Sequence, residues 1–289
     1  MKCINKRFVR VCSLLLVCSL CTISGTGCGE NRLEDAFEAD LPGIGIQTSE
    51  ESSKIPYFAS NLCVTDADVQ DIEADTEDAL AACFFNLDEK KVLYAKNIHE
   101  RMYPASTTKI MTALVALDKG DLDAQTTVSK EAITFSESGV STAKLKEGDV
   151  LTLRQLLYAL LTVSANDAAN VIAEQIAGSQ DAFVEMMNQE AQKIGATNTH
   201  FVNANGLHSE DHYTTVYDLY LMFNAAMQHE EFLQMLQEKE YQASYQAADG
   251  TTVEAVWSTT NQFTKGDVTV PDGVTAVGGK TGTTTAAMS

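Results

Sequence analysis

The stretch that decides the fold of this 289-residue chain is Tyr103-Pro104-Ala105-Ser106-Thr107-Thr108-Lys109-Ile110-Met111-Thr112-Ala113-Leu114. Pro104 halts any regular structure just before Ser106, and apolar residues then recur at helical spacing until Gly120 gives a stop signal. We therefore expect a helix over residues 107–119. Ser106 and Lys109 lie three residues apart at its start, so their side chains share one face and the amine can reach the hydroxyl.

Two further polar motifs follow in order, Ser164-Ala165-Asn166 and Lys280-Thr281-Gly282. Together the three motifs supply a nucleophile, its base, a proton relay and a strand that binds a substrate carboxylate. This set of groups indicates acyl transfer through a serine ester. A lysine is a base only when it is neutral, which requires burial or a nearby cation, and Lys280 is the candidate cation for Lys109. The start of the helix adds N–H groups and partial positive charge that favour a developing oxyanion.

The first two motifs also have plainer interpretations. Ser141-Thr142-Ala143-Lys144 repeats the Ser-x-x-Lys spacing, but no apolar helical run stands behind it, so Ser106 is the better nucleophile. Ser164 and Asn166 lie between two expected helices, where both residue types are common helix caps. In the functional interpretation, Ser164 relays a proton and Asn166 contacts a substrate amide.

The third motif follows Val277-Gly278-Gly279. It is either a glycine-rich turn or a strand edge along which a peptide pairs backbone to backbone. In the second case Lys280 and Thr281 hold a substrate carboxylate by charge and hydrogen bond.

The order of the expected elements indicates the fold class. Residues 81–86 and 91–96 are expected as a strand hairpin with a turn at 88–90. Helices are expected over 152–162, 167–177, 180–194 and 215–228, and strands over 241–247, 252–259 and 268–278. A hairpin, then helices, then strands is an α+β arrangement.

Charge and composition narrow the function. The formal net charge is −20, which argues against nucleic acid as a partner, because phosphate binding needs a basic surface. Residues 30–78 hold 14 acidic residues and two basic ones. We therefore expect residues 29–75 to be an acidic flexible tether, with an acidic partner-binding arm as the alternative, and a folded domain over 76–289.

The N-terminus has the pattern of an export signal over residues 1–28. Four basic residues precede the apolar run 11–23, which is too short to span a bilayer comfortably. The run leads into Gly25-Thr26-Gly27-Cys28, where small residues before a cysteine suggest lipidation of Cys28, with simple cleavage as the alternative. The protein is therefore expected in the cell envelope, outside the cytoplasm, either secreted or held at the membrane by this lipid.

Cysteine and histidine spacing does not indicate a metal site. Beyond Cys28 only Cys63, in the expected tether, and Cys83, in an expected strand, remain, which suggests neither a disulfide framework nor a zinc site. His208 and His212 lie four residues apart in a polar stretch without an HExxH pattern. A surface loop is the favoured interpretation for them.

The chain resembles the serine-type D-alanyl-D-alanine carboxypeptidases, the low-molecular-mass penicillin-binding proteins, over about residues 81–287. The resemblance rests on residues 103–114 and on a second block, Thr199-His200-Phe201-Val202-Asn203 through Gly206-Leu207 to His212-Tyr213-Thr214-Thr215-Val216-Tyr217-Asp218. It implies the β-lactamase/transpeptidase-like fold, an antiparallel sheet with a helical subdomain.

The resemblance also implies roles. Ser106 attacks the carbonyl between the two terminal D-alanines of a peptidoglycan stem peptide, Lys109 takes its proton, and Ser164 helps pass a proton to the departing amine. Asn166 orients the substrate, and the segment Lys280, Thr281, Gly282 and Thr283 binds it, with backbone N–H groups of Ser106 and Thr283 as the oxyanion hole. β-Lactams are expected to acylate Ser106 as substrate mimics. No metal or organic cofactor is implied.

In similar proteins two more strands and a final helix follow the Lys-Thr-Gly segment, whereas this chain stops at Ser289. We therefore expect an incomplete carboxypeptidase domain, because a strand without its neighbours leaves a costly open edge. The resulting hypothesis is that the chain as it stands has little or no activity. Robust release of D-alanine by residues 29–289 would refute it.

Three rival interpretations remain open. A serine β-lactamase shares the three motifs, but the Glu-x-x-Leu-Asn loop of the closest type is absent, and residues 201–205 read Phe-Val-Asn-Ala-Asn instead. A non-catalytic protein that binds cell wall or penicillin is disfavoured by the intact Ser106 and Lys109. A purely structural lipoprotein would leave all three motifs unexplained.

Overall fold

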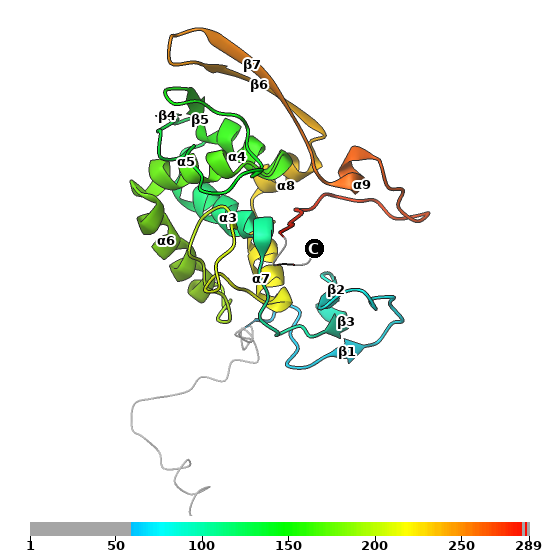
Figure 1. Ribbon diagram of the computed structural model, residues 1–289. Coiled ribbons are helices and arrows are strands. Elements are labelled where there is room, and N and C mark those ends of the chain that lie inside the picture. Colours follow the sequence, from blue (N-terminus) through cyan, green and yellow to red (C-terminus); the bar gives the residue numbers. More distant parts are fainter. Residues whose placement is uncertain (1–58, 285–286, 288–289) are drawn as a thin grey trace, which may run out of the picture. The chain divides into compact units, whose positions relative to one another are not determined.

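The computed structural model describes residues 59–284 and 287 (Figure 1). The export signal, Cys28 and most of the expected tether lie outside these residues. In the described part, a first sheet has the order β1-β3-β2 and is antiparallel, with β1 at Val69–Gln70, β2 at Ala82–Asn86 and β3 at Lys91–Lys96. The expected hairpin is thus confirmed. Its turn is held by Asn86, whose Oδ1 accepts hydrogen bonds from the N–H groups of Asp88 and Glu89.

The helices form a layer around α3, Lys109–Lys119, which packs against α4, α5, α6 and α7 (Figure 1). Every residue of α3 from Lys109 to Ala116 is buried, so this helix is the centre of the hydrophobic core. Its neighbours are α4, Leu153–Thr162; α5, Asn166–Ala177; α6, Gln180–Lys193; and α7, Val216–Ala226. All lie where helices were expected.

Helix ends follow capping chemistry. Thr152 begins α4 with a capping box to Gln155, and Ser179 and Thr215 cap α6 and α7 with their hydroxyls. Gly178 ends α5 in the left-handed conformation that glycine adopts without cost. These local signals explain why the helix boundaries were predictable.

A second antiparallel sheet has the order β4-β5-β6-β7. Its strands are β4, Gln125–Thr127; β5, Val150–Thr152; β6, Glu240–Gln246; and β7, Thr252–Ser258. The long β6–β7 hairpin lies where two strands were expected and is joined to α4 by the stacked rings of Tyr158 and Tyr241, 3.8 Å apart between centroids. Two short helices, α8 at Glu230–Gln237 and α9 at Gln262–Lys265, were not predicted.

Residues 268–278, expected as a strand, form none in the structure. Pro271 and Gly273 make a turn in its middle, where the N–H of Val274 donates to the Pro271 carbonyl at 3.1 Å. Lys280-Thr281-Gly282 is likewise not part of a ladder. Threonine and valine favour a pleated surface, but a strand exists only where a neighbouring strand accepts its backbone hydrogen bonds.

Folded structure begins earlier than Thr76, because residues inside the expected tether are packed. Cys63 is fully buried; its N–H donates to the Tyr220 hydroxyl at 2.8 Å, and its carbonyl accepts from the Tyr217 hydroxyl at 3.1 Å. β1 then joins the first sheet. The acidic composition misled the prediction because the acids here lie on exposed positions around the buried Cys63 and the partly buried Leu62 and Val69.

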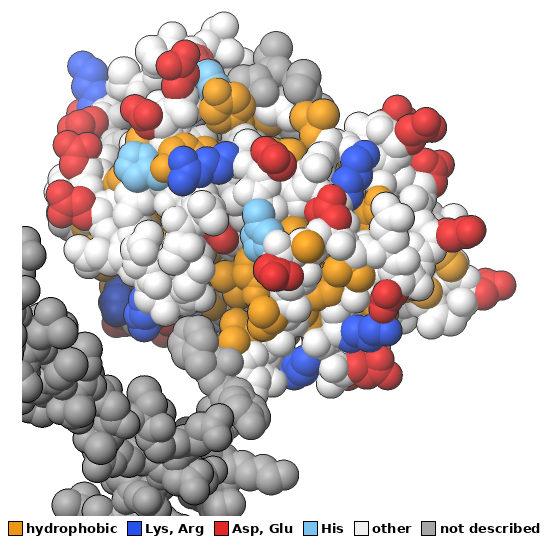
Figure 2. All heavy atoms as spheres, turned by 90° about the horizontal axis from the view of Figure 1, so that it is seen from below, with side chains coloured by type: hydrophobic (Ala, Val, Ile, Leu, Met, Phe, Trp, Pro, Cys, Tyr) orange, Lys and Arg blue, Asp and Glu red, His pale blue; other side chains and the backbone are white. Residues whose placement is uncertain are grey.

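The surface of the described part carries both kinds of charge. Exposed large hydrophobic residues near the first sheet include Leu80 and Phe84, 52% and 56% exposed. Figure 2 shows apolar side chains gathered on one face, with acidic and basic residues interspersed around them. Within residues 59–284, no helix is long and apolar enough to cross a bilayer.

Candidate active site

Ser106 and Lys109 meet in a tight turn rather than in the first turn of an α-helix. Residues Ala105–Thr108 form a 3₁₀ turn, η1, which runs directly into α3. In 3₁₀ geometry residues three apart lie on the same side, and Ser106 Oγ lies 3.0 Å from Lys109 Nζ. Ala105, just before the nucleophile, is buried at φ +49°, a conformation that costs a non-glycine residue energy and that the surrounding packing must hold.

The Lys109 amine is completely buried and has three polar neighbours. Besides Ser106 Oγ, these are Asn166 Oδ1, at 2.6 Å, and the Asn205 carbonyl. Burial lowers the pKa of Lys109 well below its ordinary value, the charge of Lys280 lowers it further, and Asp167 opposes them. In its neutral form the amine has two N–H groups and one lone pair; when Asn166 Oδ1 and the Asn205 carbonyl accept the N–H groups, the lone pair faces the Ser106 hydroxyl.

Ser164 is not a helix cap, which was one of its two interpretations from the sequence. The residue before α5 is Ala165, without a side-chain cap, and Asn166 is the first residue of the helix. Ser164 is buried at φ +58°, and its Oγ accepts a hydrogen bond from Lys280 Nζ at 3.0 Å. The structure therefore joins the second and third motifs directly.

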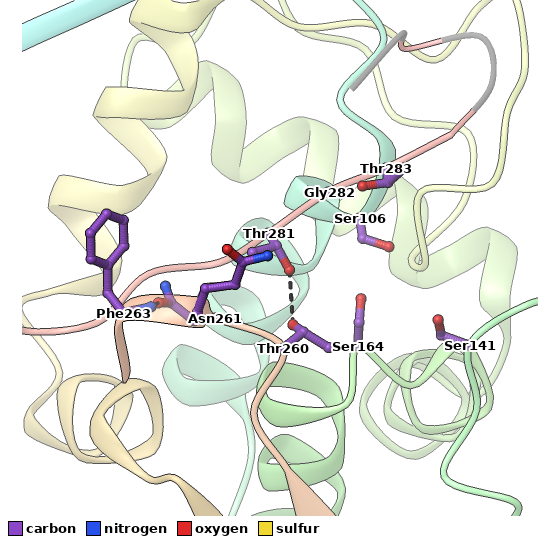
Figure 3. A pocket seen from close by; sticks show the side chains of 10 residues that line it. Ser106, Ser141, Ser164, Thr260, Asn261, Phe263, Thr281, Gly282 and Thr283 are labelled. Atoms are coloured by element: carbon purple, nitrogen blue, oxygen red, sulfur yellow. Dashed lines mark hydrogen bonds between the residues drawn. The ribbon is translucent and has the colours of Figure 1, made fainter. Parts of the chain in front are cut away.

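The Lys280-Thr281-Gly282 segment runs extended along the η1 turn (Figure 3). Thr281 Oγ1 lies 2.8 Å from Thr260 Oγ1, and Asn261 Nδ2 donates to the Gly279 carbonyl at 3.2 Å. A Cβ at Gly282 would lie 3.0 Å from the Thr107 nitrogen, so only glycine approaches the turn this closely without displacement. Burial lowers the pKa of Lys280 to about 8, so this lysine is still mainly charged at neutral pH.

These groups face a cleft of about 530 Å³. Ser141 and Ser164 lie on one side of it, while Ser106 lies on the other side, beside Gly282 and Thr283 (Figure 3). Ser141 is the serine of the competing motif. The segment that follows it is fixed by the Asp167 carboxylate, which accepts hydrogen bonds from the N–H groups of Ala143 and Leu145 at 2.9 and 3.1 Å. Lys144 is exposed, and among the described contacts none joins it to Ser141, so the lysine of this motif is not placed as a base for its serine.

The loop 203–207 is the part of the site that the sequence did not reveal. Its contribution to Lys109 is a backbone carbonyl, that of Asn205, which leaves no side-chain signature. The loop is held by Thr112, whose hydroxyl donates to the Ala204 carbonyl at 2.6 Å, and by Asn205 Nδ2, which donates to Asn170 Oδ1 at 3.0 Å. The loop belongs to the second block on which the resemblance rests, but that resemblance gave it no role in the site. Its high asparagine content is typical of loops bonded to their own backbone.

Gly206 presses this loop against the nucleophile turn, and we expect Gly206→Ala to be strongly destabilising. A Cβ there would lie 2.0 Å from the Ala105 carbonyl oxygen, at φ +86°. We expect the free energy of unfolding to fall by about 2–4 kcal/mol through strain and overpacking. Gly250→Ala is the matched control, since Gly250 has φ +82° with nothing within 4 Å, and it should cost only about 1–2 kcal/mol. Equal losses in urea unfolding would show that the contact with Ala105 does not matter.

The interpretation of His208 and His212 as a surface loop is correct only for His208. His208 is exposed, with its ring against Tyr103 at 4.6 Å between centroids, whereas His212 is 2% exposed. The polar neighbours Glu210 and Asp211 point to solvent while the chain turns His212 inward. Residues 208–212 are too few to show a regular alternation of exposed and buried side chains, so the burial of His212 could not be predicted from the sequence.

Comparison with known proteins gives consistent results. A family model described as D-alanyl-D-alanine carboxypeptidase matches residues 68–289. The D-alanyl-D-alanine carboxypeptidase DacF of Bacillus subtilis is 39% identical over 156 residues, 53% of this chain and 40% of the relative. DacB2 of Mycobacterium tuberculosis, which bears the same name, is 41% identical over 155 residues, 53% of this chain and 52% of the relative. The matched regions thus span about half or less of these relatives.

Among solved structures, the Streptomyces K15 DD-transpeptidase is similar with a TM-score of 0.65 at 30% identity, over 77% of this chain and 84% of that one. A penicillin-binding protein homologue from Mycobacterium tuberculosis gives a TM-score of 0.62 at 35% identity, over 72% of this chain and 74% of that one. This likeness confirms the expected fold class, an α+β fold of the transpeptidase type.

Proposed function

The chain belongs to the D-alanyl-D-alanine carboxypeptidase family, and from this membership we propose that the whole protein removes the terminal D-alanine from peptidoglycan stem peptides through an acyl-enzyme on Ser106. The observation that carries the proposal is the contact of 3.0 Å between Ser106 Oγ and the buried Lys109 amine. An uncharged amine with its lone pair toward a hydroxyl is the base that a serine nucleophile requires.

The proposed reaction follows from the placement of these groups. Ser106 Oγ attacks the carbonyl carbon of the last peptide bond as its proton passes to Lys109 Nζ. The C–N bond then breaks as the proton held by Lys109 passes through the Ser164 hydroxyl to the departing D-alanine amine, which leaves Lys109 neutral and Ser164 protonated. Water afterwards hydrolyses the Ser106 ester, which regenerates the hydroxyl and releases the shortened peptide. Backbone N–H groups of Ser106 and Thr283 are proposed to stabilise the oxyanion.

The substrate is proposed to lie along the cleft wall formed by Lys280, Thr281, Gly282 and Thr283. The charged Lys280 amine and the Thr281 hydroxyl are suited to a terminal carboxylate, and the side chain of Asn166 to a substrate amide. β-Lactams, which present a carboxylate beside a strained amide, are the proposed covalent inhibitors.

A substrate in the cell wall requires a protein outside the cytoplasm. We propose that residues 1–28 direct export, that an acidic tether follows them, and that a lipid on Cys28 attaches the protein to the membrane. Nucleic acid is not a proposed partner, because the net charge is −20.

The proposal is tested by incubating the whole protein with two synthetic peptides that differ only in the chirality of the last residue. D-Alanine is expected to be released from the peptide ending in D-Ala-D-Ala and nothing from its L-alanine counterpart. A penicillin should form a long-lived adduct. Rapid turnover of the penicillin without peptide cleavage would instead identify a β-lactamase.

The pH dependence of acylation should be bell-shaped because the two lysines must be in opposite states. The rate rises as pH rises through the pKa of Lys109, because only the neutral amine is a base. It falls as pH rises through about 8, where Lys280 loses its proton and its attraction for carboxylate. The rate constant for acylation by a penicillin, measured over about pH 5 to 10, reports both limbs.

Lys280→Arg tests whether the fall in rate at alkaline pH is caused by deprotonation of Lys280. A guanidinium stays protonated throughout this range, so the limb near pH 8 should disappear even if the overall rate is lower. An unchanged alkaline limb in Lys280→Arg would mean that another group titrates there.

A further inference from the structure

His212 occupies a buried position beneath the nucleophile turn, and both of its ring nitrogens have partners. Nε2 lies 2.7 Å from Thr108 Oγ1, and Nδ1 accepts a hydrogen bond from the Val202 N–H at 3.1 Å. Because a backbone N–H can only donate, Nδ1 is unprotonated and Nε2 carries the hydrogen. The ring is therefore neutral, in one defined tautomer, and its N–H donates to Thr108.

The two partners of His212 belong to the two segments that hold Lys109. Thr108 is the residue before Lys109 in the turn that carries Ser106. Val202 begins the stretch that leads to Asn205, whose carbonyl accepts from Lys109. The imidazole thus links the turn that carries Ser106 to the loop whose Asn205 carbonyl accepts a hydrogen bond from Lys109.

The chain around His212 is fastened to the same two segments. Met102 and Thr214 exchange both backbone hydrogen bonds, at 2.7 and 2.9 Å, and His200 and Tyr213 do the same at 2.9 and 3.0 Å. The backbone at 213–214 therefore pairs on one side with Met102, which precedes η1, and on the other with His200, which precedes the loop 203–207. The Phe201 ring packs edge-on against the imidazole at 5.6 Å between centroids.

We propose that His212 is a positioning residue that fixes Lys109 between Ser106 Oγ and the Asn205 carbonyl. This inference rests on the proposed function, since it assigns His212 to the base of that reaction. His212 touches neither substrate nor the reacting atoms; it acts through Thr108 and Val202. Without it, the turn and the loop separate, water reaches Lys109, and the amine regains part of its ordinary basicity in water.

Two substitutions of His212 each remove one of its two hydrogen bonds and keep the other. In His212→Asn the amide oxygen stands where Nδ1 was and still accepts from Val202, but the donor to Thr108 is lost. In His212→Gln the amide nitrogen stands where Nε2 was and still donates to Thr108, but the acceptor for Val202 is lost. Thr108→Val removes the other partner of the first bond, so its effect and that of His212→Asn should not add in the double variant.

Acylation by a fluorescent penicillin should be about tenfold or more slower in His212→Asn and in Thr108→Val, since small displacements of a catalytic base have effects of this size. The acid limb of the pH profile should move up by about one pH unit as Lys109 becomes hydrated. His229→Gln, a histidine whose ring contacts Asp118 at 3.1 Å, is the control and should change neither quantity. Thermal unfolding checks that each variant is folded.

A second readout needs no activity. In protein with ¹³C-labelled lysine, NMR titration reports the pKa of Lys109, and ¹⁵N shifts report the His212 tautomer. The titratable groups facing Lys109 are Lys280 and Asp167, and those facing His212 are His200, His208 and Lys109, so their variants calibrate the titration. A higher Lys109 pKa in folded His212→Asn supports the inference, whereas an unchanged pKa, or a hydrogen found on Nδ1, overturns it. If wild-type protein is not acylated, the proposed function fails, while this titration still decides the role of His212.

Discussion

Ser106→Ala is expected to eliminate the covalent penicillin adduct. Among the described serines, Ser106 is the one whose Oγ lies 3.0 Å from Lys109 Nζ, an amine whose pKa burial lowers well below its ordinary value. Lys280 Nζ, which contacts Ser164 Oγ, is mainly charged at neutral pH. Without the Ser106 oxygen, no ester can form at this site. Intact-protein mass spectrometry after exposure to a penicillin should show full labelling of the wild type and none of the variant.

Ser141→Ala is the matched control for this experiment. Ser141 begins the second Ser-x-x-Lys sequence and lies in the same cleft, but its lysine, Lys144, is exposed. Peptide mapping should locate the adduct on Ser106 in both wild type and Ser141→Ala. An adduct on Ser141 would show that the nucleophile has been assigned to the wrong motif.

Lys109→Met is expected to slow acylation by a factor on the order of 10²–10⁴, the range associated with loss of a general base. Methionine has a similar length and suits a fully buried position, so the fold should survive. Its thioether leaves Asn166 Oδ1 and the Asn205 carbonyl without their donor, which costs about 1–3 kcal/mol of stability. Stopped-flow acylation and urea unfolding measure the two effects separately.

Lys109→Arg separates a base from a positive charge. A guanidinium remains protonated at every accessible pH, so it can attract an oxyanion or carboxylate but cannot accept the serine proton. We expect acylation as slow as in Lys109→Met, without recovery at high pH. Retention of the wild-type rate would mean that Lys109 acts through its charge and that another group takes the proton.

Much of the fold could be predicted because its signals are local. The capping residues Thr152, Ser179 and Thr215 and the stop signal Gly178 act within a turn of the helix they bound. The prediction failed where an outcome depended on distant partners. Residues 268–278 have strand composition but no neighbouring strand, and Cys63 lies in an acidic stretch but packs beneath Tyr217 and Tyr220 of α7.

The candidate site shows the same division. The sequence by itself determined that Ser106 and Lys109 lie on one side of a turn, because a spacing of three residues is a property of the local backbone. Only the tertiary structure decided that the amine is buried, that its acceptor is a carbonyl 96 residues away, and that Lys280 meets Ser164 across 116 residues. The reason is that protonation depends on burial and on neighbouring charge, and both arise from packing between segments that local sequence patterns do not relate.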